Sequence, residues 1–199
     1  MNLGRVTVAR KSGGEHFRHG GRDLGFDLLS FWQWSSSDLL SNSMRGVLAE
    51  YLVARALRAD ADGVREEWAP YDLTTENGTK VEVKSAGYLQ SWHQEQLSLI
   101  SFVVPKRRPF DANTNQLGEQ AARQADVYVF ALLSHKDKVT VDPMDVDQWT
   151  FFVVPTSVLD QRKRSQHSIT LSTLEKLCSQ SVSFGGLKDA VIEAARCQE

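Results

Sequence analysis

Three charged side chains lie close together in the sequence between Pro70 and Ser85. Asp72 precedes a Glu-Asn-Gly turn, and Glu82 and Lys84 follow that turn with one valine between them. Such a turn predicts a β-hairpin that brings the two carboxylates together, and hard oxygen ligands of this kind suit Mg²⁺. Because side chains alternate along a strand, Lys84 should share a face with Glu82. A divalent cation beside an ammonium group is suited to breaking a phosphodiester bond.

The same residues have a simpler interpretation. The stretch from Thr79 to Lys84 alternates polar and apolar residues, so Glu82 and Lys84 could form the wet face of an ordinary half-buried strand. Asp72 lies in a largely apolar segment that begins at Trp68, where a buried carboxylate needs a cation or an ion pair. A salt bridge from Asp72 to Lys84 is the alternative to a metal.

The length of the turn decides whether the two carboxylates can meet. A two-residue loop of Asn77 and Gly78 would pair Asp72 with Val83 and send Asp72 to the face opposite Glu82. A three-residue loop that ends at a left-handed Gly78 would pair Asp72 with Glu82 instead. A shared metal site therefore predicts the longer loop, or an equivalent bulge or strand kink.

A further carboxylate, Glu50, lies in a segment expected to be helical. Residues 44–58 combine an apolar stripe with small side chains, which predicts a helix that lies close on a sheet after a polar cap at Asn42 or Ser43. Glu50 has small residues one turn away on either side, so it should border the packed face. An ion pair with an arginine on the same helix explains this position about as well as a metal does, and Arg45 and Arg55 are the candidates.

The other segments predict an α/β fold with a mixed central sheet flanked by helices, because strands alternate with helices after the hairpin. The expected strands are the hairpin at 68–75 and 79–86, then 97–104, 127–133 and 149–154. The expected helices are 116–125, 172–178 with a capping box at Ser172, and 187–196. The segment 26–40 should plug the core, and the aromatic residues expected inside are Phe31, Trp32, Trp34, Trp149, Phe151 and Phe152.

Composition narrows the class of protein. A hydrophobic content of 41% supports a sizeable core, and the longest apolar runs are too short to span a bilayer. The net charge of −2 counts against a protein that merely coats nucleic acid, but a carboxylate-rich metal site tolerates it. Two cysteines without zinc-type spacing indicate a reducing compartment, and the start of the chain lacks a secretory signal. We therefore expect a cytoplasmic protein that has no membrane partner.

Taken together, the candidate residues resemble the PD-(D/E)xK nuclease superfamily, whose members share a restriction-endonuclease-like fold. The superfamily pattern is a helix glutamate, an aspartate opening one strand, and Glu-x-Lys on the next. Here the pattern reads Glu50, Pro70-Tyr-Asp72 and Glu82-Val-Lys84, with one extra residue after the proline. The resemblance covers residues 44–104 and implies an N-terminal arm and packing segment at 1–43, followed by a nuclease domain at 44–199.

The resemblance also implies a ligand set and an activity. Asp72, Glu82 and the Val83 carbonyl would bind one or two Mg²⁺ ions, for which Mn²⁺ should substitute, and Glu50 would join through water or a second ion. Lys84 would orient or deprotonate the attacking water, or offset charge on the phosphate. The implied activity is metal-dependent hydrolysis of nucleic acid, as by a DNA endonuclease of restriction, repair or defence type.

Candidate contacts to the nucleic acid follow the hairpin. Gln90 or His93 could touch phosphate, and Tyr88 or Trp92 could stack on a base, although a surface loop with one buried aromatic also explains the segment. His93 could also donate a proton to the leaving group. The basic run Lys106, Arg107 and Arg108 could track the backbone, or it could be ordinary solvated charge.

Two other classes remain open. A catalytically silent scaffold of the same fold would bind nucleic acid or a protein, and a structural protein would use the four charges as an ion-pair network. The presence of Glu50, Asp72, Glu82 and Lys84 together favours the enzyme. Since no separate recognition domain is evident, the enzyme would act with a specificity subunit or as a homodimer that cuts both strands.

Overall fold

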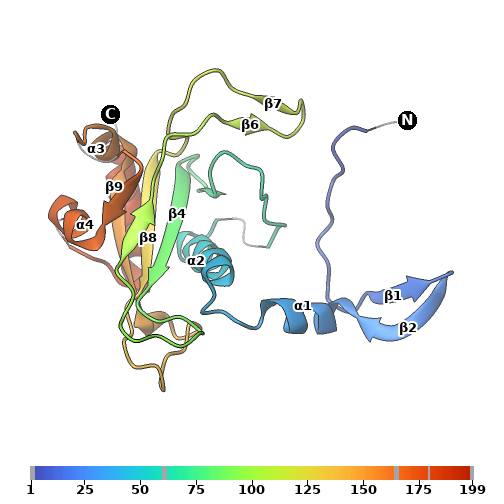
Figure 1. The fold of residues 1–199 in the computed structure, drawn as a ribbon. Helices are drawn as coiled ribbons and strands as arrows, with labels where there is room; N and C mark the ends of the chain where they lie inside the picture. The colour runs from blue at the N-terminus through green and yellow to red at the C-terminus, as the bar shows by residue number, and fades with distance from the viewer. Residues whose placement is uncertain (1–2, 60–61, 164–165, 179, 198–199) are drawn as a thin grey trace.

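A mixed β-sheet lies at the centre of the protein, in a computed structural model that describes residues 3–59, 62–163, 166–178 and 180–197. Its strand order is β3 (Leu73–Thr74), β4 (Lys80–Gly87), β8 (Val127–Leu133) and β9 (Trp149–Pro155). Strands β4 and β8 are parallel, whereas β3 with β4 and β8 with β9 are antiparallel. The predicted α/β class with a mixed sheet flanked by helices is confirmed (Figure 1).

Shorter elements surround this sheet. The helices are α1 (Leu28–Ser36), α2 (Asn42–Leu57), α3 (Thr156–Asp160), α4 (Leu171–Leu177) and α5 (Leu187–Arg196), with 3-10 turns η1 (Val146–Gln148) and η2 (Phe184–Gly186). The remaining strands are β1 (His16–His19), β2 (Arg22–Asp27), β5 (Ser101–Val103), β6 (Phe110–Asp111), β7 (Gln116–Leu117) and β10 (Ser168–Thr170). Within the described ranges, no helix is both long enough and apolar enough to cross a lipid bilayer.

The two faces of the sheet bury different residues because side chains alternate along each strand. Val83 of β4 and Val129 of β8 belong to a core shared with α2 and α5. Phe130 of β8 belongs to a second core, which β5, β10 and α4 close on the opposite face. Strand β8 is buried along its whole length, as its uninterrupted apolar run predicts. Trp149 and Phe151 on β9 are also buried, which confirms their predicted place.

Helix α2 carries one of the candidate carboxylates and lies against β4. It begins after Ser41, whose hydroxyl accepts a hydrogen bond from the Met44 amide at 3.4 Å. It ends at Arg58, whose left-handed φ of 55° allows its amide to close the last turn. Its residues Ala49 and Val53 are fully buried. These small side chains let the helix approach the sheet closely, as predicted, with the cap slightly earlier than expected.

The N-terminal arm differs from its predicted role. Strands β1 and β2 form a hairpin that leads into α1, and this unit extends away from the sheet (Figure 1). Its aromatic residues do not plug the core, because 84% of Trp34, 45% of Phe31 and 37% of Trp32 are exposed. Aromatic composition alone predicted burial, but α1 has no buried residue. The arm is tied to the body further upstream, where Arg10 donates to the Asp62 carbonyl at 2.8 Å.

The helix predicted at 116–125 is also wrong. The segment instead forms β7 and an extended stretch in which Ala122 pairs with Arg107 in both directions, at 3.0 and 3.1 Å. The physical reason is Arg123, whose buried guanidinium donates to the Val104 carbonyl at 2.8 Å. A helix would lose the two backbone bonds between Ala122 and Arg107 and the bond from Arg123 to Val104, which follows β5. The strand predicted at 97–104 is shortened to Ser101–Val103, and Thr170, rather than Ser172, precedes α4, without a side-chain cap.

Candidate active site

The hairpin that carries the candidate carboxylates has the longer of the two loops. Thr75 and Thr79 close the loop through an amide-to-carbonyl hydrogen bond of 2.9 Å. Gly78, between them, has the left-handed φ of 82° that a three-residue loop requires. The predicted three-residue loop is therefore confirmed, and it pairs Thr74 with Lys80 and Leu73 with Val81.

The strand bends at Asp72. Leu73 is the register partner of Val81, and the Asp72 amide donates to the same Val81 carbonyl at 3.1 Å. Two residues of β3 and its extension thus face one residue of β4, which is the pattern of a β-bulge. The bend lets an Asp72 carboxylate oxygen accept from the Val83 amide at 2.7 Å. Because the N–H and C=O of one strand residue point to the same side, the Val83 carbonyl also faces Asp72.

Asp72 lies among other carboxylates. Its pKa is raised from 3.8 to about 7, first by burial and then by the negative charges of Glu82 and Glu50. The hydrogen bond from Val83 and the charge of Lys84 oppose this rise without cancelling it. Carboxylates that repel one another at a buried position are stabilised by a cation or by a proton. The geometry thus concentrates negative charge where the sequence predicts a metal.

Glu82 and Lys84 share a face of β4, as their spacing predicts. The Lys84 ammonium donates to a carboxylate oxygen of Glu82, and 29% of the lysine side chain and 17% of the glutamate side chain are exposed. The expected alternative, a salt bridge from Lys84 to Asp72, is not the pairing observed. Lys84 therefore lies beside the carboxylates with its ammonium group partly open to solvent.

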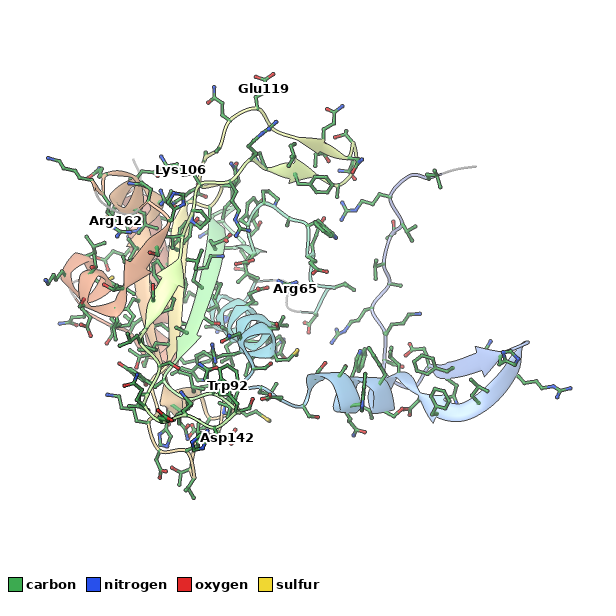
Figure 2. The ribbon with its side chains drawn as sticks, viewed as in Figure 1. Arg65, Trp92, Lys106, Glu119, Asp142 and Arg162 are labelled. Carbon is green, nitrogen blue, oxygen red and sulfur yellow. The ribbon has the colours of Figure 1, made fainter. Side chains whose placement is uncertain are left out.

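Glu50 faces the same region from α2, and its partner is an arginine that the sequence did not single out. Arg65 donates to both Glu50 oxygens, one of them at 2.9 Å from Nη2, and only 15% of the Glu50 side chain is exposed. Figure 2 shows Arg65 beside α2. The alternatives Arg45 and Arg55 bind elsewhere, to the Leu40 carbonyl and to Asp62.

The donor set is chemically suited to Mg²⁺. Across the part of the chain that the structure describes, no three His, Cys, Asp or Glu side chains form a group able to hold a metal ion by themselves. Mg²⁺ does not require such a cage, because it commonly uses one or two carboxylates and completes its shell with water and substrate phosphate. Asp72, Glu82 and the Val83 carbonyl can supply those oxygens, and Glu50 can reach through water.

Two cavities meet at Asp72. One, of about 330 Å³, is lined by Glu50, Arg65 and Asp72 among others. The other, of about 530 Å³, is lined by Asp72 together with the aromatic rings of Trp68 and Phe110. Asp72 is therefore open to a ligand from both cavities.

The residues predicted to touch nucleic acid after the hairpin lie at the far end of β4. Gln90 is buried, and its side chain bonds to Arg45 at 3.4 Å and to Ser98 at 3.2 Å. These bonds hold the Gln90 side chain in the interior, which does not favour the predicted phosphate contact. Tyr88 is half-buried in the second core, and the Lys136 ammonium lies 4.6 Å from the centre of its ring.

Trp92 and His93 are exposed but remote from the carboxylates. Trp92 is 54% exposed, and its carbonyl accepts from Lys138. Figure 2 places Trp92 at the end of the sheet opposite Lys106. Since Asp72 bonds to the first half of β4, neither Trp92 nor His93 stands beside it.

The basic run is exposed and partly engaged. Lys106 forms an ion pair with Asp160 at 3.1 Å, and Arg108 donates to the Gly118 carbonyl. The Arg107 backbone pairs with Ala122. These contacts fix the backbone of the run while leaving the side chains at the surface.

Two residues near the carboxylates were missed as site residues from the sequence. Arg65 and Trp68 both lie in the segment that joins α2 to the hairpin. That segment leads from the helix that carries Glu50 to the strand that begins after Asp72. Its position between two candidate ligands was the available signal.

The architecture and the site together define a mixed α/β protein with half-buried acids beside a lysine. Residues 27–173 match the family model described as bacteriophage T4 endonuclease IV. Because the match spans more than half of the chain, the protein belongs to this endonuclease family. No curated protein matches its sequence. The matched range includes Glu50, Asp72, Glu82 and Lys84.

Proposed function

We propose that the protein is a metal-dependent nuclease that hydrolyses phosphodiester bonds in DNA, as a PD-(D/E)xK-type endonuclease acting in restriction, repair or defence. Membership of an endonuclease family supports a nucleic acid substrate. The observation that carries the metal-dependent part is the position of Asp72 near Glu82 and Glu50, where burial first and then the two negative charges raise its pKa to about 7. Ionised carboxylates at such a position are costly unless a cation is bound.

The residues have separate roles in this proposal. Asp72, Glu82 and the Val83 carbonyl would hold Mg²⁺, and Glu50 would contribute through water or a second ion. When bound, Mg²⁺ polarises the scissile phosphate and lowers the pKa of bound water. Lys84, whose ammonium now donates to Glu82, can donate to the attacking water or to a phosphate oxygen on the same side of the strand. Arg65 balances the charge of Glu50.

One observation favours the ion-pair network as a second candidate. Glu50 is paired with Arg65, and Glu82 with Lys84, so both glutamates are already compensated. In a purely structural network Asp72 would also need a cationic partner. Its carboxylate accepts from the Val83 amide, and Lys84 lowers its pKa less than burial and the two glutamates raise it. The ion pairs therefore account for the two glutamates, and a metal ion at Asp72 would supply the positive charge that they do not.

Cleavage assays test the proposal. The substrates are linear, circular, branched and single-stranded DNA, with an RNA strand beside them, in Mg²⁺ and in Mn²⁺. Asp72→Ala and Lys84→Ala should each lower the rate by about 100-fold or more, since each removes a group that acts on the reacting phosphate. Glu193→Ala, an exposed carboxylate on α5, is the control.

The outcomes separate the candidates. Cleavage by the wild type that both variants retain, with unchanged far-UV circular dichroism, would refute the assignment of the site. Absence of both cleavage and Mn²⁺ binding in the wild type would favour the network. The circular substrate adds the mode of action, because nicking is expected of a single subunit and linearisation of a homodimer.

A further inference from the structure

An exposed tryptophan, Trp68, lines the same cavity as Asp72. Trp68 is 65% exposed, although large aromatic side chains are usually mostly buried. Its ring centre lies 5.7 Å from that of Phe110, at an interplanar angle of 62°, so the two rings meet edge to face. This contact orients the indole and still leaves most of its surface open.

Phe110 provides a firm wall for this arrangement. It lies in the β6–β7 hairpin, opposite Leu117. The Gly118 amide donates to the Pro109 carbonyl at 2.7 Å. At Gly118 a Cβ atom would lie 2.8 Å from Pro109 Cγ, so only glycine permits this close approach. The hairpin therefore holds Phe110 in place against Trp68.

The two aromatic rings and Asp72 line one cavity of about 530 Å³. Pro70 and Pro109 add apolar surface to its wall. Arg5 and Asn113 add polar groups, and the Arg5 guanidinium donates to the Asn113 side chain at 3.4 Å. The cavity thus combines a flat aromatic surface, a polar rim and a carboxylate that faces the proposed scissile phosphate. A nucleotide has the matching parts, which are a flat π-face and a phosphate joined by a sugar.

We propose that this cavity binds a nucleobase of the substrate strand, stacked on Trp68, next to the phosphate that lies at Asp72. The inference rests on the proposed function, because it places the base relative to the cleaved phosphate. It moves the stacking surface from Trp92, at the far end of β4, to a tryptophan that shares a cavity with Asp72. Trp68 is therefore a substrate-positioning residue.

Binding to two strands of equal length tests this inference. One is a labelled oligodeoxynucleotide of mixed sequence, and the other is the same deoxyribose-phosphate backbone without bases. Both are titrated in EDTA, which prevents metal-dependent cleavage, and gel electrophoresis after each titration checks that the strands are intact. Trp68→Leu should weaken binding of the base-bearing strand by about 5- to 150-fold, the range for loss of one stacked base. It should leave binding of the abasic strand unchanged.

Two further variants complete the experiment. Trp68→Tyr should retain most of the affinity, because a tyrosine ring also stacks on bases. Trp34→Leu, which removes an indole that is 84% exposed on α1, should have no effect on either strand. Circular dichroism confirms that each variant is folded.

The possible results are distinct. Equal weakening of both strands by Trp68→Leu, or no weakening of either, would overturn the stacking inference while leaving the nuclease proposal intact. No binding of either strand by the wild type would count against both proposals. Selective weakening of the base-bearing strand supports the inference even if cleavage later proves independent of metal.

Discussion

Arg65 forms a bidentate ion pair with Glu50 and thereby balances one of the negative charges near Asp72. The guanidinium donates to both Glu50 oxygens, and Glu50 and Asp72 in turn raise the pKa of Arg65. Arg65 thus supplies part of the positive charge that a divalent cation would bring to the same carboxylates. In the proposed metal site, an arginine in this position would compete with the cation for Glu50.

Replacing that arginine should therefore strengthen metal binding. Arg65→Met removes the competing charge and should lower the Kd for Mn²⁺ by up to about 5-fold, the factor that corresponds to an ion pair of ~1 kcal/mol. Titration followed by electron paramagnetic resonance measures the Kd without reference to activity. Arg55→Met, which removes an equal charge from α2 and from a pair with Asp62, is the matched control. If both variants change the Kd equally, the effect is general electrostatics and the specific competition is absent.

The pKa of Asp72 predicts how stability should depend on pH. In the folded protein Asp72 keeps its proton up to about pH 7, whereas in the unfolded chain it ionises near 3.8. Between these values the unfolded chain releases its proton first, so the free energy of unfolding falls as pH rises toward 7. The raised pKa of Asp72 therefore costs no stability below about pH 4, and it lowers the free energy of unfolding by its full amount above about pH 7.

Asp72→Asn should remove this penalty. The asparagine carbonyl can still accept from the Val83 amide, but it carries no charge. Urea unfolding in EDTA should show similar stability of variant and wild type near pH 4, and a variant more stable by a few kcal/mol at pH 8. Glu193→Gln on α5 is the control for removal of an acid elsewhere. A stability difference that is the same at both pH values would contradict the raised pKa.

The position of the hairpin could be predicted because the Glu-Asn-Gly turn signal is local. The sequence left a two-residue and a three-residue loop open, and only a shared metal site for Asp72 and Glu82 required the longer loop, in which Gly78 is left-handed. The buried run that forms β8 was clear from its uninterrupted apolar residues, because both of its faces are covered. Local sequence pattern was therefore sufficient for the turn and the buried strand, but not for the length of the loop.

Long-range contacts account for what could not be predicted. The partner of Glu50 lies outside α2, so helix spacing pointed to Arg45 and Arg55 rather than to Arg65. Trp34 resembles a core residue by type, yet its helix extends away from the sheet. The extended segment around Arg123 depends on a carbonyl in the preceding strand region. Each of these positions is determined by a neighbour distant in sequence.

The burial of Gln90 predicts a structural role that can be measured. Its side chain lies between Arg45 and Ser98, so Gln90→Ala removes a hydrogen bond to each of them. The free energy of unfolding should fall by about 1–3 kcal/mol, because each such bond contributes about 0.5–1.5 kcal/mol. Affinity for an oligonucleotide should change little at a temperature where the variant is folded. Gln96→Ala, at an exposed position in the same segment, is the control, and a binding defect without loss of stability would restore the phosphate-contact prediction.

The basic run makes a prediction about salt. If Lys106, Arg107 and Arg108 contact the backbone, changing all three to alanine should flatten the dependence of log binding constant on log salt. Each lost phosphate contact should reduce the slope by about 0.9 for duplex DNA or about 0.7 for a single strand. Lys106 is already paired with Asp160, so its share should be smaller than that of the two arginines. A triple variant of Lys176, Lys188 and Arg196 on α4 and α5 removes the same charge elsewhere. Equal slopes for the two triple variants would show that the run adds only general positive charge, because a backbone track must depend on where its charges lie.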